Sequence, residues 1–144
     1  MKTSFGTPEN PIVLKAGVYR VGDPCYSVPD GRWMEWLEKA NYTEELNLVA
    51  RLDGHAVVGL GTAYGDGVYP DNCGNTYGVD AGLIGLVPND LPGIKQYPSR
   101  SRSLFHTITF HEPVKVWSDD KGTLHFGELE IYTGDMDDEE DKDY

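Results

Sequence analysis

The stretch LGTAYGDGVYPDNCGNTYGVDAGLIG, residues 60–85, decides how this chain is organised. Tyrosines and aspartates are set in it among closely spaced glycines. Glycine is tolerated inside a folded chain mainly where φ is positive or where another group comes close. The stretch is therefore a constrained segment that places polar groups at its bends.

Hairpin signals flank this stretch. Asp53-Gly54 is the strongest of them, because this dipeptide favours the tight turn between antiparallel strands. Ala16-Gly17 is a weaker turn of the same kind. The two predicted hairpins pair Leu48–Leu52 with His55–Leu60, and Ile12–Leu14 with Val18–Val21.

Three further strands are expected at Tyr77–Val87, Leu104–Trp117 and Leu124–Tyr132. In the last of them the apolar phase changes across Gly127, which a β-bulge explains. Strands that follow one another as hairpins form antiparallel sheets. The predicted fold class is α+β and mainly antiparallel β, a sandwich or a strongly curved sheet of about seven or eight strands.

One helix is expected, over residues 30–40. Trp33, Trp36, Leu37 and Ala40 follow the spacing of one buried helical face. Asp30 suits the N-cap, and Asn41 suits the left-handed residue just after the helix. The two tryptophans favour packing of this helix against a sheet.

Composition and charge bound the function. The chain has 144 residues and a net charge of −12. We expect one globular domain over residues 1–133 and a disordered acidic tail over residues 134–144. A free nucleic-acid binder is basic, so direct DNA or RNA binding is not expected. No apolar run is long enough for a membrane helix, and a cytoplasmic location is the default.

Four aspartates beside glycine-rich turns are the candidates for a ligand or metal site: Asp23, Asp66, Asp71 and Asp80. Gathered carboxylates bind Ca²⁺ or Mg²⁺ and perform acid–base chemistry. Their spacing does not match a calcium loop, and Asp at a glycine turn commonly bonds its own backbone. The sequence therefore predicts no particular metal, no cofactor and no catalytic residue. Of the two cysteines, Cys73 is expected to be the more exposed.

Interface candidates come from exposed-looking loops and from the tail. Tyr64 and Tyr69 lie in the glycine-rich stretch, and Arg100 and Arg102 lie in a long proline-containing loop. The tail adds the acidic run Asp137, Asp138, Glu139 and Glu140. An acidic surface of this kind suits a basic partner or mimicry of a phosphate backbone.

Several blocks resemble a family of small uncharacterised proteins from phages and bacteria. The blocks are GDPCY at residues 22–26, a helix tryptophan at Trp33, GTAYGDGVY at residues 61–69, and VDAGLIG at residues 79–85. Ala81 stands where the family commonly has Ser. The resemblance implies a phage or bacterial setting and brings no activity with it.

Two functions are expected to compete. The first is an interaction protein, encoded by a phage, that binds and modulates a host protein, with charge mimicry of nucleic acid as one route. The second is a small hydrolase or a metal- or ligand-binding domain that uses Asp23, Asp66 and Asp80. The acidic balance favours the first, and the clustering of aspartates, glycines and tyrosines favours the second. The oligomeric state does not follow from the sequence.

Overall fold

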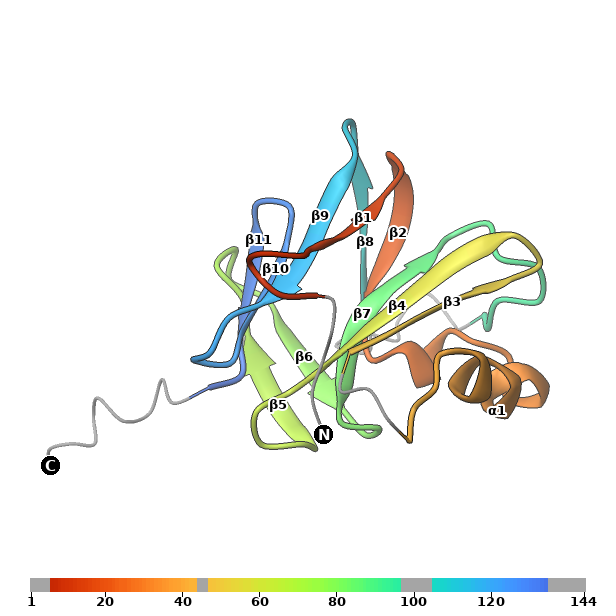
Figure 1. Cartoon of the computed structure of the whole chain (residues 1–144), viewed down its shortest axis with the longest axis horizontal. Coiled ribbons are helices and arrows are strands. Elements are labelled where there is room, and N and C mark those ends of the chain that lie inside the picture. The colour runs from red at the N-terminus through yellow and green to blue at the C-terminus, as the bar shows by residue number, and fades with distance from the viewer. Residues whose placement is uncertain (1–5, 44–46, 97–104, 135–144) are drawn as a thin grey trace, which may run out of the picture.

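The computed structural model describes residues 6–43, 47–96 and 105–134. Within them the chain forms an α+β fold of eleven strands and one α-helix, and the strands pair antiparallel in three sheets (Figure 1). The predicted fold class is therefore confirmed. The N-terminal and C-terminal parts of the described chain meet, because the Ser118 amide donates to the Gly6 carbonyl oxygen at 3.0 Å.

The largest sheet has the strand order β3-β4-β7-β2-β8. Its strands are β2 (Gly17–Gly22), β3 (Asn47–Leu52), β4 (His55–Gly61), β7 (Leu83–Pro88) and β8 (Phe105–Phe110). Gly85 lies at its centre, opposite Gly59 on β4. A Cβ added to Gly85 would stand 1.7 Å from the Val58 carbonyl oxygen, so the close approach expected at this glycine is present.

A second sheet has the order β1-β9-β10-β11. Its strands are β1 (Ile12–Leu14), β9 (Val114–Ser118), β10 (Thr123–Phe126) and β11 (Leu129–Tyr132). The third sheet is a hairpin of β5 (Gly67–Pro70) and β6 (Thr76–Val79). An isolated bridge between Asp71 and Ile131 joins this hairpin to β11.

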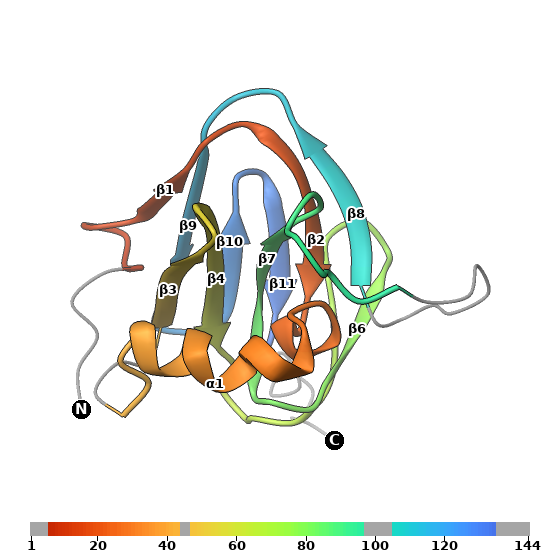
Figure 2. The ribbon, with the colours of Figure 1, turned by 90° about the vertical axis from the view of Figure 1, so that its right-hand side faces the viewer.

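Two apolar clusters hold three layers together. The larger lies between the two big sheets, where Val58 and Ile84 on one side meet Phe126 and Ile131 on the other, all fully buried. Alternate residues of each strand point into it, as the period of a half-buried strand requires. The smaller cluster lies between the five-stranded sheet and helix α1 (Asp30–Lys39), which lies in front of β3, β4 and β7 in Figure 2.

The helix has the expected extent but differs at its start. Pro29 occupies the N-cap position, and Asp30 is the first helical residue, where its carboxylate pairs with Lys95 at 2.6 Å. Trp36 is fully buried and its indole N–H donates to the Val57 carbonyl oxygen at 3.1 Å, so it anchors the helix to the sheet. Asn41 has φ of 63°, which confirms the left-handed residue after the helix.

The Asp53-Gly54 hairpin is confirmed. The two turn residues have φ of 52° and 81°, as a type I′ turn requires, and they join β3 to β4. The Ala16-Gly17 hairpin is wrong, because β1 pairs with β9, and β2 pairs with β7 and β8. The chain bends at Ala16-Gly17, and β1 and β2 on either side of this bend belong to different sheets.

Each of the three long predicted strands is two strands joined by a turn. β6 and β7 replace Tyr77–Val87, β8 and β9 replace Leu104–Trp117, and β10 and β11 replace Leu124–Tyr132. The phase change at Gly127 is a hairpin turn and not a bulge, since Phe126 pairs with Leu129 and Gly127 has φ of 64°. These three divisions, with the unforeseen β5, raise the expected strand number to eleven.

Candidate functional site

The buried carboxylate of Asp23 joins two of the glycine-rich turns. Asp23 follows β2 and caps the 3-10 helix η1 (Pro24–Tyr26), where its Oδ1 accepts from the Cys25 amide at 3.0 Å. Its Oδ2 accepts from the amides of Asp80 and Ala81 at 2.7 and 2.6 Å. Both oxygens are therefore engaged with backbone donors, and the turn after β2 is held against the turn between β6 and β7.

Asp80 is tied to the same segment through its side chain. Its Oδ2 accepts a hydrogen bond of 2.7 Å from the Tyr26 hydroxyl. Burial and then this hydrogen bond raise the pKa of Tyr26, so its hydroxyl stays protonated and acts as a donor. The blocks at residues 22–26 and 79–85 are thus neighbours in space, although they are far apart in the sequence.

Cys25 lies in the middle of this contact but is not activated. Burial raises the pKa of its thiol to about 12, and the negative charge of Asp23 adds to the shift. The thiolate is the nucleophilic form of cysteine, and such a pKa leaves almost none of it at neutral pH. Cys73 is exposed while Cys25 is half-buried, as the sequence predicted.

Asp71 belongs to a different part of the molecule. Its Oδ1 accepts from the amides of Cys73 and Asn75, both at 2.8 Å, and its Oδ2 accepts from the Tyr77 hydroxyl at 2.6 Å. Burial would raise the pKa of Asp71, but the hydrogen bonds from Tyr77, Asn75 and Cys73 outweigh it and hold the pKa below its ordinary value. This carboxylate orders the β5–β6 turn.

The remaining candidates are scattered. Asp66 is exposed, and Tyr64 is 64% exposed. Tyr69 is buried and its hydroxyl donates to the Gly65 carbonyl oxygen at 2.9 Å, so it supports the loop before β5 and does not form surface as expected. Arg100, Arg102, Asp137, Asp138, Glu139 and Glu140 lie outside the described residues.

The predicted aspartate site is therefore brought together only in part. Asp23 and Asp80 meet, Asp66 is an exposed loop residue, and Asp71 lies on another turn. Within residues 6–43, 47–96 and 105–134, no three His, Cys, Asp or Glu side chains are grouped so as to hold a metal ion. The geometry that is present locks turns together through carboxylate–amide hydrogen bonds.

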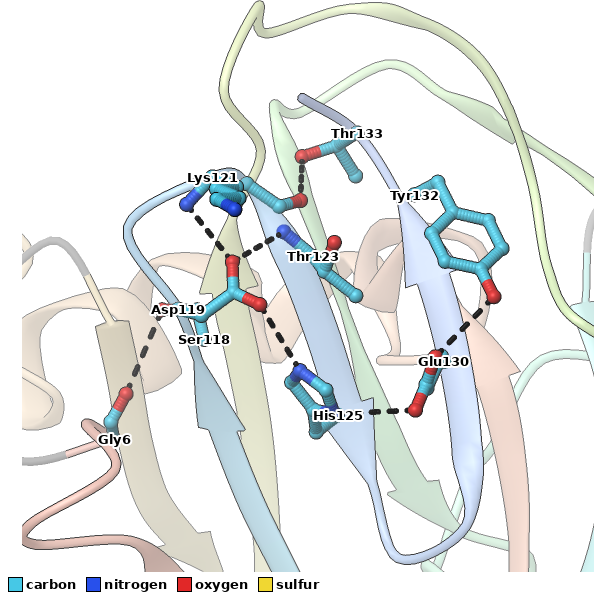
Figure 3. A network of polar contacts seen from close by, with 10 residues as sticks. Gly6, Ser118, Asp119, Lys121, Thr123, His125, Glu130, Tyr132 and Thr133 are labelled. Atoms are coloured by element: carbon cyan, nitrogen blue, oxygen red, sulfur yellow. Dashed lines mark hydrogen bonds and ion pairs between the residues drawn. The ribbon is translucent and has the colours of Figure 1, made fainter. Parts of the chain in front are cut away.

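Sequence reasoning missed a polar network on the outer face of the four-stranded sheet (Figure 3). Its centre is His125 on β10, whose Nε2 lies 3.2 Å from Asp119 Oδ2 and whose Nδ1 lies 3.8 Å from Glu130 Oε2. The Tyr132 hydroxyl donates to Glu130 Oε1 at 3.2 Å. The Trp117 ring stacks on His125 with centroids 3.8 Å apart.

The strand register explains this network. His125 is directly opposite Trp117 on β9 and Glu130 on β11, so the three side chains form one cross-strand row. Asp119 is fixed by the amides of Lys121 and Thr123 at 2.9 and 3.0 Å. These bonds, with His125, outweigh the effect of burial and lower the pKa of Asp119. Only the correct pairing of β10 with both β9 and β11 could have revealed the row.

The network borders the glycine-rich loops. The Ala63 amide donates to Thr133 Oγ1 at 3.0 Å, and Thr133 Oγ1 donates to the Gly122 carbonyl oxygen at 2.6 Å. The Thr62 amide donates to the Gly82 carbonyl oxygen at 3.1 Å. The loop before β5, the turn after β6 and the turn before β10 therefore lie together at one end of the molecule.

Acidic side chains are concentrated at that end. We call the acidic end the five acids carried by these turns and by β11: Asp66, Asp80, Asp119, Asp120 and Glu130. In the sequence, no Lys or Arg occurs between Arg51 and Lys95, and Lys121 is the only one from Asp119 to Gly134. With Trp117 and Tyr132 beside it, this surface combines carboxylates and aromatic rings, which both attract cationic side chains.

None of the helices in the part of the chain that the structure describes is long and apolar enough to cross a membrane. The resemblance to small phage and bacterial proteins stays a prediction. No family model, curated protein or solved structure matches the chain.

Proposed function

We propose that this chain is a non-enzymatic binding protein that engages a basic surface of another protein through the acidic end. The observation that carries the proposal is the gathering of five acids from separate segments near a single lysine, Lys121. Such a single-sign surface attracts and orients a partner of opposite charge over distances of about 10 Å at 0.1 M salt.

The aromatic row gives the same surface a means of recognition at short range. Trp117 and Tyr132 are half-buried on the outer face of the sheet, next to Glu130. A guanidinium or ammonium group gains from lying over an aromatic ring while it pairs with a carboxylate. We propose that Arg or Lys side chains of the partner bind in this row.

The tail extends the acidic end in the sequence. Gly134 abuts the Lys121 carbonyl and Gly122, so the chain leaves the described structure beside the Asp119–Lys121 turn. The residues that follow Gly134 include the run Asp137–Glu140. We propose that they add to the attraction of a basic partner, in line with the steering that exposed charges provide.

The resemblance to phage and bacterial proteins extends the proposal to its setting. The partner would be a host protein, the site of action its cytoplasm, and the binding would modulate the partner's activity. A partner surface that normally holds nucleic acid is the most suitable target, because it is built to bind a row of negative charges.

Capture from a bacterial lysate with charge variants tests the proposal. The variant Asp66→Asn/Asp120→Asn removes two exposed charges of the acidic end. Its matched control, Glu38→Gln/Glu112→Gln, removes two exposed charges elsewhere. A partner retained by the wild type and the control, and lost by the first variant, supports the proposal. Equal retention by both variants contradicts it.

A further inference from the structure

A hollow between the two large sheets lies away from the acidic end. It is a groove of about 820 Å³, within the range of roughly 300–1,000 Å³ typical of small-molecule sites. Its walls are β1 with the link to β2 on one side and β3 with the turn to β4 on the other, and residues 88–90 after β7 close one end. β1 and β3 are both terminal strands of their sheets, so the space between the sheets opens here.

The groove is lined by apolar side chains. Val49 and Ala56 are partly buried and pack against the core cluster between the two large sheets. Val13 and Val18 also border the groove, but they alternate with the core-facing residues Ile12, Leu14 and Tyr19, so their side chains lie on the outer faces of the sheets. An apolar molecule in the groove could therefore cover Val49 and Ala56, which the fold itself leaves partly exposed.

Two basic side chains line this groove, although the protein as a whole is strongly acidic. Lys15 and Arg51 both line it and are both exposed. Elsewhere Arg32 pairs with Glu35 and Lys95 pairs with Asp30, each within 2.8 Å. Among the ion pairs of the described residues, none involves Lys15 or Arg51.

One acid also stands at the rim. Asp90 is 84% exposed at its side chain and lies 3.5 Å from His55 Nε2. Asp90 thus has His55 beside it. Arg51 Nη1 donates to the Gly54 carbonyl oxygen at 3.2 Å, which leaves the other N–H groups of this guanidinium and the Lys15 ammonium to meet a carboxylate. Charge complementarity at this site favours an anion.

We propose that the groove binds a small amphipathic anion, an alkyl or aryl carboxylate, with its apolar body over Val49 and Ala56 and its carboxylate between Lys15 and Arg51. This site is separate from the acidic end and its ligand has the opposite charge. The inference therefore does not rest on the proposed protein partner, and either can fail alone.

Calorimetric titration with dodecanoate, below its micellar concentration, tests the site. The wild type should bind it, and Lys15→Gln/Arg51→Gln should weaken the binding by about tenfold, since two exposed charge pairs are lost. The control Lys115→Gln/Lys121→Gln removes two exposed cations that do not line the groove and should leave the affinity unchanged. Both changes alter exposed side chains, and thermal melts check that each variant folds.

A second pair of variants tests the apolar part. Ala56→Glu places a negative charge inside the groove, on the face of β4 that points between the sheets, and should abolish binding, whereas Val68→Glu adds a negative charge at a 69% exposed position outside the groove and should not. Acetate has the carboxylate without the long alkyl chain, and dodecanol has the chain without the carboxylate. Each should therefore bind at least about tenfold more weakly than dodecanoate. Absence of dodecanoate binding, equal binding of dodecanol, or equal effects of each variant and its control would overturn the proposal.

Discussion

Asp23 Oδ2 accepts a hydrogen bond of 2.7 Å from the backbone amide of Asp80, a residue 57 positions further along the chain. The same oxygen accepts from Ala81 at 2.6 Å. One buried carboxylate therefore fixes a turn that no strand pairing holds directly, and it brings Asp80 within reach of Tyr26.

Replacing Asp23 by Asn should lower the free energy of unfolding by about 2–4 kcal/mol. The Asn side chain keeps one acceptor oxygen and replaces the other by an NH2 group, so at least one of the part-buried amides of Cys25, Asp80 and Ala81 loses its charged acceptor. Urea unfolding measures the loss. The matched change Asp66→Asn, at an exposed position, should shift stability by less than about 0.5 kcal/mol.

The double variant Asp23→Asn/Asp80→Asn then tests whether the two aspartates act as a unit. Once the turn is released, Asp80 no longer holds Tyr26, so the two losses should not add. Asp23→Asn/Asp66→Asn should be additive within about half a kcal/mol. Additivity in both pairs would show that Asp23 and Asp80 serve separate turns.

Adding a methyl group at Gly85 should prevent stable folding. The new Cβ would stand 1.7 Å from the Val58 carbonyl oxygen, and β4 cannot move away without breaking the centre of the five-stranded sheet. Gly31→Ala is the control, because nothing lies within 4 Å of a Cβ there and alanine favours the helix by up to about 1 kcal/mol. Melting temperatures should fall steeply for the first variant and rise slightly for the second, and a well-folded Gly85→Ala would contradict the packing.

The pKa of Asp71 makes a specific prediction about acid stability. A carboxyl group whose pKa is lower in the folded state stabilises the fold above its unfolded pKa of about 3.9. That contribution is lost as the pH falls from this value through the depressed folded value. Wild type should therefore lose stability below about pH 4 more steeply than Asp71→Asn, which lacks this group and is less stable at neutral pH. Parallel curves of unfolding free energy between pH 5 and pH 2 would contradict the assignment.

Deleting residues 135–144 should leave the fold intact, since seven of these ten residues are acidic and the segment has little apolar surface to bury. A melting temperature lower by many degrees would show that this segment is docked. If the tail helps to attract a basic partner, the deletion should slow association at low salt and have little effect above about 0.5 M, where charges are screened. Stopped-flow association at several salt concentrations measures the difference.

Local signals decided which elements were predictable. Asp53-Gly54 needs positive φ at both turn positions and the helix carries a regular apolar face, and both elements were predicted within one residue. Gly127 shows the limit, because a phase change in an apolar pattern fits a bulge as well as a two-residue turn. The structure has the turn, which pairs Phe126 with Leu129.

The candidate site was less predictable, because its contacts cross the chain. Asp23 was singled out from its glycine neighbour, but nothing local indicates that its partners are the amides of Asp80 and Ala81. The row of Trp117, His125 and Glu130 depends on the register of three strands. The apolar pattern of the sequence determines neither the turns nor the strand register, so it cannot predict that these side chains lie together.

Binding of a partner at the acidic end is tested by a map of backbone amide and Trp117 indole NMR shifts in the labelled protein, recorded as a partner captured from lysate is added. We expect changes at Trp117, along β10 and β11 and in the loop around Asp66, with little change along α1. Changes confined to α1 and β3, with the Trp117 indole signal unmoved, would contradict it.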